Sequence, residues 1–263
     1  MDLQIKGKIA LVTAASSGLG FAVARQLADE GVLLAICSRD RDRISAAASR
    51  IATASRGTVI PYVCDVTKDS DVEMMLEKIA VDIGYPDILV SNAGGPPAGK
   101  ALDFQLEDYR QAVELNLLST VRLCRGVLPS MQAKRWGRIV TITSVSVKQP
   151  LDNLILSNTA RSGVTAYLKT LSNQVAAYGI TVNAVCPGYT RTDRVEELSR
   201  AYADQGKGAS SEFFAALEKD IPMKRLGKPE ELAKTVAFLV SEGAAYITGV
   251  SLQVDGGYIK GLF

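Results

Sequence analysis

The amino-acid sequence predicts a doubly wound α/β fold, in which helices cover both faces of a parallel seven-stranded sheet. Short β-rich runs alternate along the chain with longer stretches of helical patterning. Several short runs are apolar almost throughout, as in IALV at 9–12 and LLAIC at 33–37, which is typical of strands buried on both faces. A chain of 263 residues suits one large domain, so we expect a single domain over 1–263.

The predicted strands are short and rich in apolar and β-branched residues. They lie at 8–13 (KIALVT), 33–38 (LLAICS), 58–64 (TVIPYVC), 87–92 (DILVSN), 137–144 (GRIVTITS), 180–186 (ITVNAVC) and 251–255 (SLQVD). Longer amphipathic stretches fill the intervals and predict helices. These lie at 18–30, 40–54, 69–83, 106–133, 154–178, 193–219 and 228–241.

One region departs from this alternation. Residues 191–227 carry the segment ADQGKGASS between two helical patterns and delay the last helix and strand. A long insertion after a strand of such a fold is placed to cover a ligand, so we expect a substrate lid at about 191–227. The apolar residues of this region suit core or oligomer contacts equally well.

The composition is that of an ordinary soluble globular protein, with 47% hydrophobic and 22% charged residues. The net charge is +2, and no basic run interleaved with aromatic residues indicates nucleic-acid binding. The apolar runs are too short to span a membrane. The N-terminus MDLQIKGKIALV lacks the apolar core and cleavage site of a signal peptide. We therefore expect a cytoplasmic protein with neither nucleic acid nor membrane as a partner.

The cysteines and the absence of histidine narrow the chemistry. Cys37, Cys64, Cys124 and Cys186 are far apart and form no CxxC pair, which predicts small buried hydrophobic side chains in a reducing compartment. The chain has no histidine, which excludes a His-centred metal site or catalytic triad, and we expect no metal. Any general acid or base must be Asp, Glu, Lys, Tyr or Cys.

A glycine-rich turn follows the first predicted strand. TAASSGLG at 13–20 leads directly into a helix, and Gly18 and Gly20 allow close backbone approach. Such a turn presents backbone N–H groups to a pyrophosphate at the positive end of the helix, although a plain strand-to-helix turn has the same appearance. The residues expected around a phosphate are Thr13, Ala15, Ser16, Ser17, Gly18, Leu19 and Gly20.

The end of the second strand indicates which dinucleotide is bound. In a dinucleotide-binding fold this end meets the adenosine ribose, where a carboxylate favours a free 2′-hydroxyl and an arginine accommodates a 2′-phosphate. Here the strand ends in Ser38, and Arg39 follows. We therefore favour NADP(H), with NAD(H) possible. The alternative is that Arg39 is a solvated member of the charged run RDRDR.

Motifs in a fixed order connect these features to a known family. They are VTAASSGLG (12–20), CDVT (64–67), SNAGG (91–95), NLLST (116–120), GRIVTITSVS (137–146), GITVNAVCPGYTRTD (179–193), RLGKPEELA (225–233) and YITGVSLQVDGG (246–257). Through them the chain resembles the short-chain dehydrogenase/reductase family over nearly its whole length. The resemblance implies a Rossmann fold. The family's loop begins T-G-x-x-x-G-x-G, so Ala14 stands where a glycine is usual, and its methyl group affects the φ and ψ of the turn.

The resemblance also implies cofactor contacts after successive strands. They are Asp65 at the adenine amino group, Val66 under the ring, Asn92, Ala93 and Gly94 beside the adenosine ribose, and Pro187, Gly188, Thr190 and Thr192 at the nicotinamide end. Each is also a reasonable turn or cap residue, but their joint occurrence at strand ends favours binding.

The catalytic residues of the family are an Asn, a Ser and a Y-x-x-x-K pair on one helix. Asn116 and Ser144 match the first two, whereas Ser157 and Arg161 stand where the pair is expected. No Y-x-x-x-K occurs elsewhere in the chain. Positions i and i+4 share one helical face, so Ser157 and Arg161 keep one hydroxyl and one cation in the same relation.

The replacements change what the site can do. Arg161 is a permanent cation that can hold ribose hydroxyls or a developing oxyanion, but it cannot relay a proton near neutral pH. Ser157 can donate a hydrogen bond but is a far weaker acid than a phenol. Lys148 and Tyr189 are candidate replacement acids, and we favour Tyr189 because it follows Pro187-Gly188 beside the expected nicotinamide.

The sequence therefore predicts an NADP(H)-dependent oxidoreductase that acts on a small carbonyl or alcohol substrate through an altered proton-transfer site. The first alternative is a nucleotide-binding sensor or scaffold with little or no turnover. The second is a non-redox enzyme that resembles halohydrin dehalogenases, which keep the Tyr and lose the glycine loop. The C-terminal VDGGYIKGLF resembles the family's oligomer-forming end, so a homodimer or homotetramer is expected. The sequence does not identify the substrate.

Overall fold

A computed structural model describes residues 2–204 and 208–262 of the chain. Seven strands form one sheet. They are β1 (Ile9–Thr13), β2 (Leu33–Ser38), β3 (Val59–Val63), β4 (Ile88–Ser91), β5 (Gly137–Ile142), β6 (Ile180–Pro187) and β7 (Ser251–Val254). All neighbouring pairs are parallel, and the order is β3-β2-β1-β4-β5-β6-β7. The predicted fold class is confirmed.

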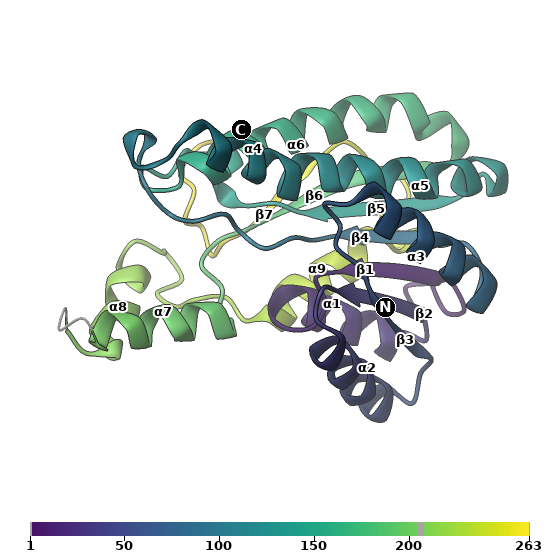
Figure 1. Ribbon diagram of the computed structural model, residues 1–263, viewed down its shortest axis with the longest axis horizontal. Helices are drawn as coiled ribbons and strands as arrows, with labels where there is room; N and C mark the ends of the chain where they lie inside the picture. The colour runs from purple at the N-terminus through teal and green to yellow at the C-terminus, as the bar shows by residue number, and fades with distance from the viewer. Residues whose placement is uncertain (1, 205–207, 263) are drawn as a thin grey trace.

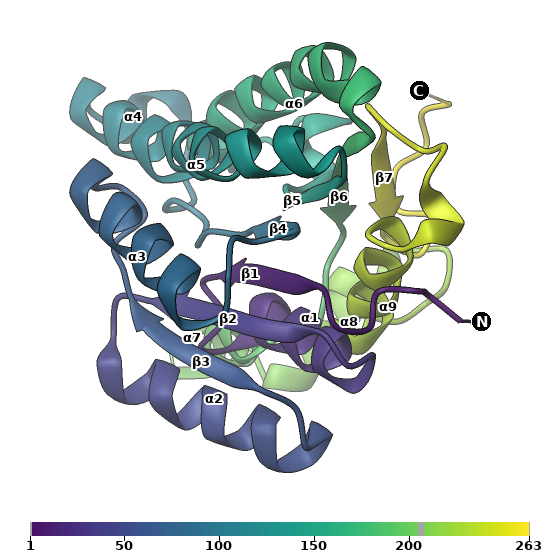
Figure 2. The ribbon, with the colours of Figure 1, turned by 90° about the vertical axis from the view of Figure 1, so that its right-hand side faces the viewer.

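The helices occupy the intervals that their patterning predicts. They are α1 (Gly18–Asp29), α2 (Arg41–Ser55), α3 (Asp69–Asp82), α4 (Leu106–Val113), α5 (Ser119–Lys134), α6 (Ile155–Val175), α7 (Asp193–Asp204), α8 (Ser210–Lys219) and α9 (Pro229–Leu239). Figure 2 shows α1, α2 and α9 on one face of the sheet and α3, α5 and α6 on the other. None of the described helices is long and apolar enough to cross a lipid bilayer.

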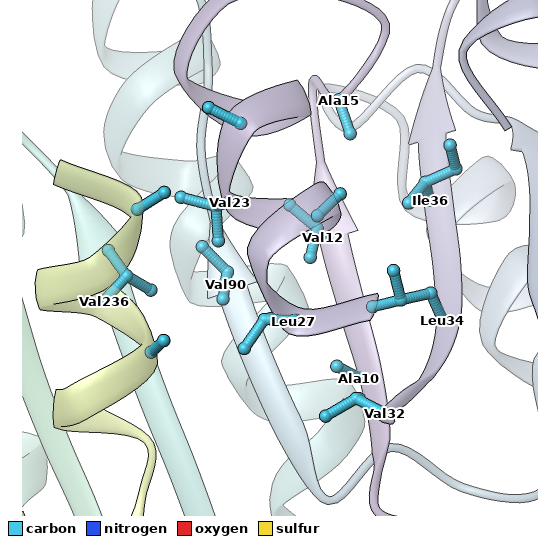
Figure 3. Close-up of a cluster of buried hydrophobic side chains, with 14 of the residues drawn as sticks. Ala10, Val12, Ala15, Val23, Leu27, Val32, Leu34, Ile36, Val90 and Val236 are labelled. Carbon is cyan, nitrogen blue, oxygen red and sulfur yellow. The ribbon is translucent and has the colours of Figure 1, made fainter. Parts of the chain in front are cut away.

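A hydrophobic core fills each space between helices and sheet. On the first face, Val23 and Leu27 of α1 pack with Val12 of β1, Ile36 of β2 and Val236 of α9 (Figure 3). These side chains are all buried, and each contributes about 1.5–3 kcal/mol of transfer free energy. All four cysteine side chains are also buried, as the sequence predicts. The two cores hold the sheet rigid at the edge where the predicted site residues lie.

Two long predicted helices are divided in the structure. The stretch expected at 106–133 contains a π-helical segment, Glu114–Leu118, between α4 and α5. Such single-turn π segments widen the helix locally and are frequent at functional sites. The stretch expected at 193–219 forms α7 and α8, which lie away from the main body of the molecule (Figure 1).

The strand order reverses direction between β1 and β4. Strands β2 and β3 continue to one side of β1, and β4 to β7 continue to the other side. In open parallel sheets, ligands bind outside the carboxyl ends of the strands at such a switch point. A hydrogen-bonded pair joins the two strand ends here, because Thr13 Oγ1 donates to Asn92 O at 2.7 Å and accepts from Asn92 N at 2.8 Å.

Candidate active site

The glycine-rich loop joins β1 to α1 in a tightly packed turn. A Cβ at Gly20 would lie 2.4 Å from Ala14 O and 2.9 Å from Asn92 Nδ2, so only glycine allows this approach. Gly18 has a φ of +58°, and Thr192 from the loop after β6 lies 3.9 Å from its Cβ position. The loop therefore brings together residues expected at the phosphates and at the nicotinamide end.

Ala14 occupies a backbone conformation that usually belongs to glycine. Its φ is +48°, in the left-handed region, where a β-carbon costs roughly 1–2 kcal/mol. Around it lie the other predicted phosphate-loop residues, all buried or half-buried: Thr13, Ala15, Ser16, Ser17, Leu19 and Gly20. The turn between β1 and α1 therefore forms with Ala14 in place of a glycine, and the backbone of Ala14 carries the strain.

The end of β2 carries a carboxylate that is already engaged. Asp40 caps helix α2 through its Oδ1, which accepts from Arg43 N at 2.9 Å. Ser38 Oγ donates to Asp40 O at 3.2 Å. Arg39 is exposed at the same turn. The capping hydrogen bond engages the carboxylate of Asp40. Arg39 remains as an exposed cation beside the position expected for the ribose.

Asp65 follows β3 and is held by its own turn. Its Oδ1 accepts from Thr67 N at 3.1 Å and from Thr67 Oγ1 at 2.8 Å. Burial acts to raise the pKa of Asp65, but these hydrogen bonds and the charges of Arg39 and Lys68 outweigh it and hold the pKa below its usual value. The next residue, Val66, is half-buried against the core.

Ser144 lies two residues after the end of β5, at the start of a short 3₁₀ turn. Its Oγ accepts from Ser146 N at 3.1 Å and caps that turn. A hydroxyl has one donor and two acceptor positions, so this contact leaves the Ser144 proton available for a carbonyl oxygen.

Asn116 lies in the π-helical segment and is buried. Its Nδ2 donates to Ala112 O at 3.2 Å, and its main-chain carbonyl accepts from Thr120 Oγ1 at 2.9 Å. Its Oδ1 has no hydrogen-bond partner within the described part of the chain. An amide oxygen that is buried without a partner carries a desolvation cost of about 1–3 kcal/mol.

Arg161 is a buried cation one helical turn beyond Ser157 on α6. Its Nη1 donates to Ile142 O and Thr143 O, both at 3.1 Å, and its Nη2 donates to Ala93 O at 3.4 Å. Burial lowers the pKa of Arg161 to about 10, which still leaves it charged at neutral pH. The guanidinium therefore connects the ends of β4 and β5 just before Ser144.

A small polar cavity lies between two of the catalytic candidates, Asn116 and Arg161, and is not lined by Ser144, Ser157 or Tyr189. Asn116, Thr141 and Arg161 line it together with Ser91, Ala93, Thr120, Ile142, Thr143 and Val164. Its water-accessible volume is about 10 Å³, which is room for about one water molecule. Thr141 Oγ1, like Asn116 Oδ1, is buried without a partner among residues 2–204 and 208–262. Ser157 is also buried, but no hydrogen bond joins it to Ser144 in this part of the chain.

The loop after β6 holds the remaining predicted residues. Gly188 packs against the end of β7, because a Cβ there would lie 2.7 Å from Asp255 Cβ. Thr190 is buried, and its Oγ1 donates to Gly188 O at 3.2 Å. Thr192 is half-buried beside the phosphate loop. Gly94, at the opposite side of the switch point, is exposed with open space around its Cα.

Tyr189 packs edge-to-face on Tyr258, with ring centroids 5.4 Å apart and an interplanar angle of 81°. Burial, and then the hydrogen bond and charge of Tyr258, raise the pKa of Tyr189 to about 12. It lines a second cavity with Arg225, Met223 and Asp255. The contacts of Tyr189 are therefore with the C-terminal segment, and its raised pKa makes it a weaker acid than an ordinary phenol.

The structure adds contacts that the sequence analysis missed. The carbonyls of Ile142 and Thr143 bind Arg161, and the side chain of Arg43 reaches Ser17 at 3.4 Å. The second contact has a local signal in the sequence, because a basic residue three positions after a capping Asp lies in the first turn of a helix. The carbonyl contacts have none, because every residue carries a carbonyl group.

Comparison with known proteins identifies relatives along the whole chain. The family model described as enoyl-(acyl carrier protein) reductase matches residues 13–259. The 3-oxoacyl-(acyl-carrier-protein) reductase FabG of Escherichia coli (strain K12) is 36% identical over 255 residues, which cover 97% of this chain and 98% of the relative.

Solved structures give the same result at the level of the fold. L-sorbose reductase from Gluconobacter frateurii, solved with NADPH and L-sorbose, superposes with a TM-score of 0.96, 32% identity and 100% coverage of both chains. A variant of actinorhodin polyketide ketoreductase solved with NADPH gives a TM-score of 0.91 and 32% identity, and covers 96% of this chain and 97% of the other.

Proposed function

The chain belongs to the short-chain dehydrogenase/reductase family, and on this premise we propose that it is an NADP(H)-dependent oxidoreductase with an altered proton-transfer site. Its reaction is hydride transfer between the cofactor and a small carbonyl or alcohol substrate. The observation that carries the proposal is the convergence of Asn116, Arg161 and the strand end before Ser144 on one polar cavity near the switch point.

The residues at the switch point fit a dinucleotide. Ser16, Ser17 and Gly18 at the start of α1 are partly exposed, so the positive end of this helix is open to a pyrophosphate. The carboxylate of Asp40 is engaged on Arg43 N, which leaves Arg39 available for a 2′-phosphate. NADPH is bound in the complexes of L-sorbose reductase and of the ketoreductase variant, which supports the choice of NADP(H). Asp65 and Val66 would hold the adenine, Asn92, Ala93 and Gly94 the adenosine ribose, and Pro187, Gly188, Thr190 and Thr192 the nicotinamide end.

When bound, the cofactor supplies or accepts the hydride. The role of Ser144 is to orient the substrate, with its free hydroxyl proton donated to the carbonyl oxygen. Arg161 provides a fixed positive charge at the nicotinamide ribose and near the developing oxyanion. Its Nη1 is fully used on carbonyls, so any contact with the ribose would come from the remaining hydrogens on Nη2 and Nε. Ser157 offers a hydrogen bond on the same face of α6, and Asn116 holds the π-helical segment beside the site.

The proton that accompanies the hydride has no strong acid in the position expected for one. The chain contains no Y-x-x-x-K sequence, and neither Ser157 nor Arg161 is a good proton donor at neutral pH. Tyr189 remains our candidate acid, although its raised pKa weakens it. This feature favours a second candidate function, an NADP(H)-binding sensor or scaffold that turns over slowly or not at all.

The test of the proposal is cofactor discrimination at Arg39. Replacing Arg39 by Ala should weaken NADPH binding by about tenfold and leave NADH binding nearly unchanged, because only NADPH carries the 2′-phosphate. Fluorescence titration of both cofactors into wild type and variant measures this. Tighter binding of NADH than of NADPH by the wild type would contradict the assignment. Consumption of NADPH with a panel of aldehydes and diketones then separates an enzyme from a sensor.

The remaining features of the proposal concern the whole protein. We infer that α7 and α8, within the stretch at about 191–227, cover the substrate, since α7 begins next to Thr192, which lies beside Gly18. Residues 205–207 of this stretch lie outside the described residues. We further infer a homodimer or homotetramer in the cytoplasm, with a small-molecule substrate. Light scattering of the purified protein tests the oligomeric state.

A further inference from the structure

We propose that Arg43 is a second cation for the cofactor's 2′-phosphate and that it determines cofactor specificity together with Arg39. This inference rests on the proposed NADP(H) function and deepens it. Arg43 lies in the first turn of α2, and its Nη2 is 3.4 Å from Ser17 Oγ in the phosphate loop. Two segments that are 26 positions apart in the sequence thus meet at one edge of the expected adenosine site.

The position of the Arg43 side chain follows from the capping of α2. Asp40 Oδ1 accepts from Arg43 N at 2.9 Å, which fixes the backbone of Arg43 at the third position of the helix. The side chain then extends back over the turn that precedes it. Its Nη2 donates to Ser17 Oγ at 3.4 Å, in the loop that follows β1. An anion held beside Ser17 at the end of β2 would therefore lie next to the Arg43 guanidinium, and the exposed Arg39 directly follows the last residue of that strand.

The local charges favour an anion at this point. The start of the 15-residue helix α2 adds a partial positive charge. Ser17 offers a hydroxyl donor, because its Oγ accepts from Arg43 and its proton remains free. Asp40 and Asp42 are the nearby carboxylates. Asp40 is used on the backbone of Arg43, and Asp42 follows the cap at the start of the helix. No salt bridge engages Arg39 or Arg43 within residues 2–204 and 208–262.

The same helical turn offers a matched control. Arg41 is two positions before Arg43, is equally exposed and carries the same charge, but has no hydrogen bond to the phosphate loop in the described part of the chain. A general effect of net charge would appear in Arg41→Ala and Arg43→Ala alike. A specific contact with the 2′-phosphate would appear in Arg43→Ala alone.

The experiment measures binding of two probes that lack the nicotinamide, namely adenosine 2′,5′-bisphosphate and adenosine 5′-monophosphate. Isothermal titration of the full-length wild type, Arg43→Ala, Arg43→Gln and Arg41→Ala gives the dissociation constants. We expect both Arg43 variants to bind the bisphosphate about tenfold more weakly, because a charge-assisted hydrogen bond is lost. Binding of the monophosphate should change less than about twofold, and Arg41→Ala should resemble the wild type with both probes.

The outcomes separate this inference from the proposed function. If the wild type prefers the bisphosphate and the Arg43 variants keep that preference in full, the role of Arg43 is wrong and the NADP(H) function stands. Equal losses in Arg41→Ala and Arg43→Ala would show a nonspecific charge effect and would also overturn the inference. A wild type that binds neither the bisphosphate nor NADPH would overturn both proposals. Circular dichroism of each variant confirms that α2 is intact.

Discussion

Arg161 belongs to the altered proton-transfer site that the proposed function assigns to α6. Its charge is buried, and its Nη atoms donate to three main-chain carbonyls from the ends of β4 and β5. Those contacts compensate the desolvation of the cation, which would otherwise cost several kcal/mol. A lysine presents its donors from one nitrogen, whereas the planar fork of arginine reaches carbonyls on both strands. The residue therefore has a positional role in addition to any role toward a cofactor.

The proposed replacement of the catalytic pair by Ser157 and Arg161 leads to a direct prediction. Ser157→Tyr combined with Arg161→Lys should raise NADPH-dependent reduction of simple carbonyl compounds by about tenfold or more, because a positioned general acid supplies roughly 10²–10⁴-fold. Steady-state rates of wild type and double variant measure the gain. The double variant must first show a native circular dichroism spectrum and bind NADPH. A folded, cofactor-binding variant with no gain would mean that the geometry of the cleft, and not the missing phenol, limits the rate.

The phosphate loop shows how one element depends on close backbone packing. Ala14 accepts a positive φ, and the next turn of the chain approaches it through Gly20. Asn92, which follows β4, takes part in the same contact. Its Nδ2 donates to Ala14 O over a distance of 3.5 Å. The element is thus fastened to the neighbouring strand at the switch point. Its conformation depends on the absence of a side chain at one position.

We therefore expect Gly20→Ala to destabilise the loop. The added methyl would lie 2.4 Å from Ala14 O, so the loop must move, and a substitution that overpacks a site costs roughly 1–3 kcal/mol. The variant should unfold at lower urea concentration and bind NADPH more weakly. Gly95→Ala is the control, because a Cβ there meets nothing within 4 Å. Wild-type stability and cofactor affinity in Gly20→Ala would show that the loop adapts without cost.

At the scale of the whole molecule, the two helical layers keep the seven strand ends at one edge, and the C-terminal segment closes one side of that edge. Tyr258 packs on Tyr189, and Asp255 packs on Gly188, so the segment after β7 supports the loop after β6. The loop after β6 and the segment after β7 are thus in contact through the partly buried phenol rings of Tyr189 and Tyr258. The ionisation of Tyr189 should couple the stability of the protein to alkaline pH.

The raised pKa of Tyr189 predicts that the stability of the protein falls at alkaline pH. Burial and Tyr258 raise its pKa from 10 to about 12 in the folded state, so the folded protein holds the proton more tightly than the unfolded chain does. The resulting stability is complete below pH 10 and is lost as the pH rises from 10 to 12. Tyr189→Phe should therefore lose less stability than the wild type over this interval, as measured by urea unfolding at each pH. An equal alkaline loss in both proteins would contradict this assignment.

Much of this protein could be predicted from its sequence alone. Short apolar runs such as LLAIC are typical of strands buried on both faces, and the helical periodicity between them favours a parallel sheet with helices on both faces. The residues at Gly18 and Gly20 and the order of the motifs also led to the prediction of a dinucleotide site, which stays a prediction. The candidates Asn116, Ser144, Ser157 and Arg161 also followed from the sequence, because a motif and a helical spacing are local properties of the chain.

The tertiary structure alone decided how those side chains are used. Arg161 and Ala93 are 68 positions apart, and only the adjacency of α6 to the ends of β4 and β5 makes a carbonyl the partner of that guanidinium. The same holds for the contact of Tyr189 with Tyr258, for the approach of Arg43 to Ser17, and for the π-helical turn that contains Asn116. A local pattern determines which face of an element is buried. The partners that meet on that face depend on the packing of elements from distant parts of the chain, which no single stretch of sequence encodes.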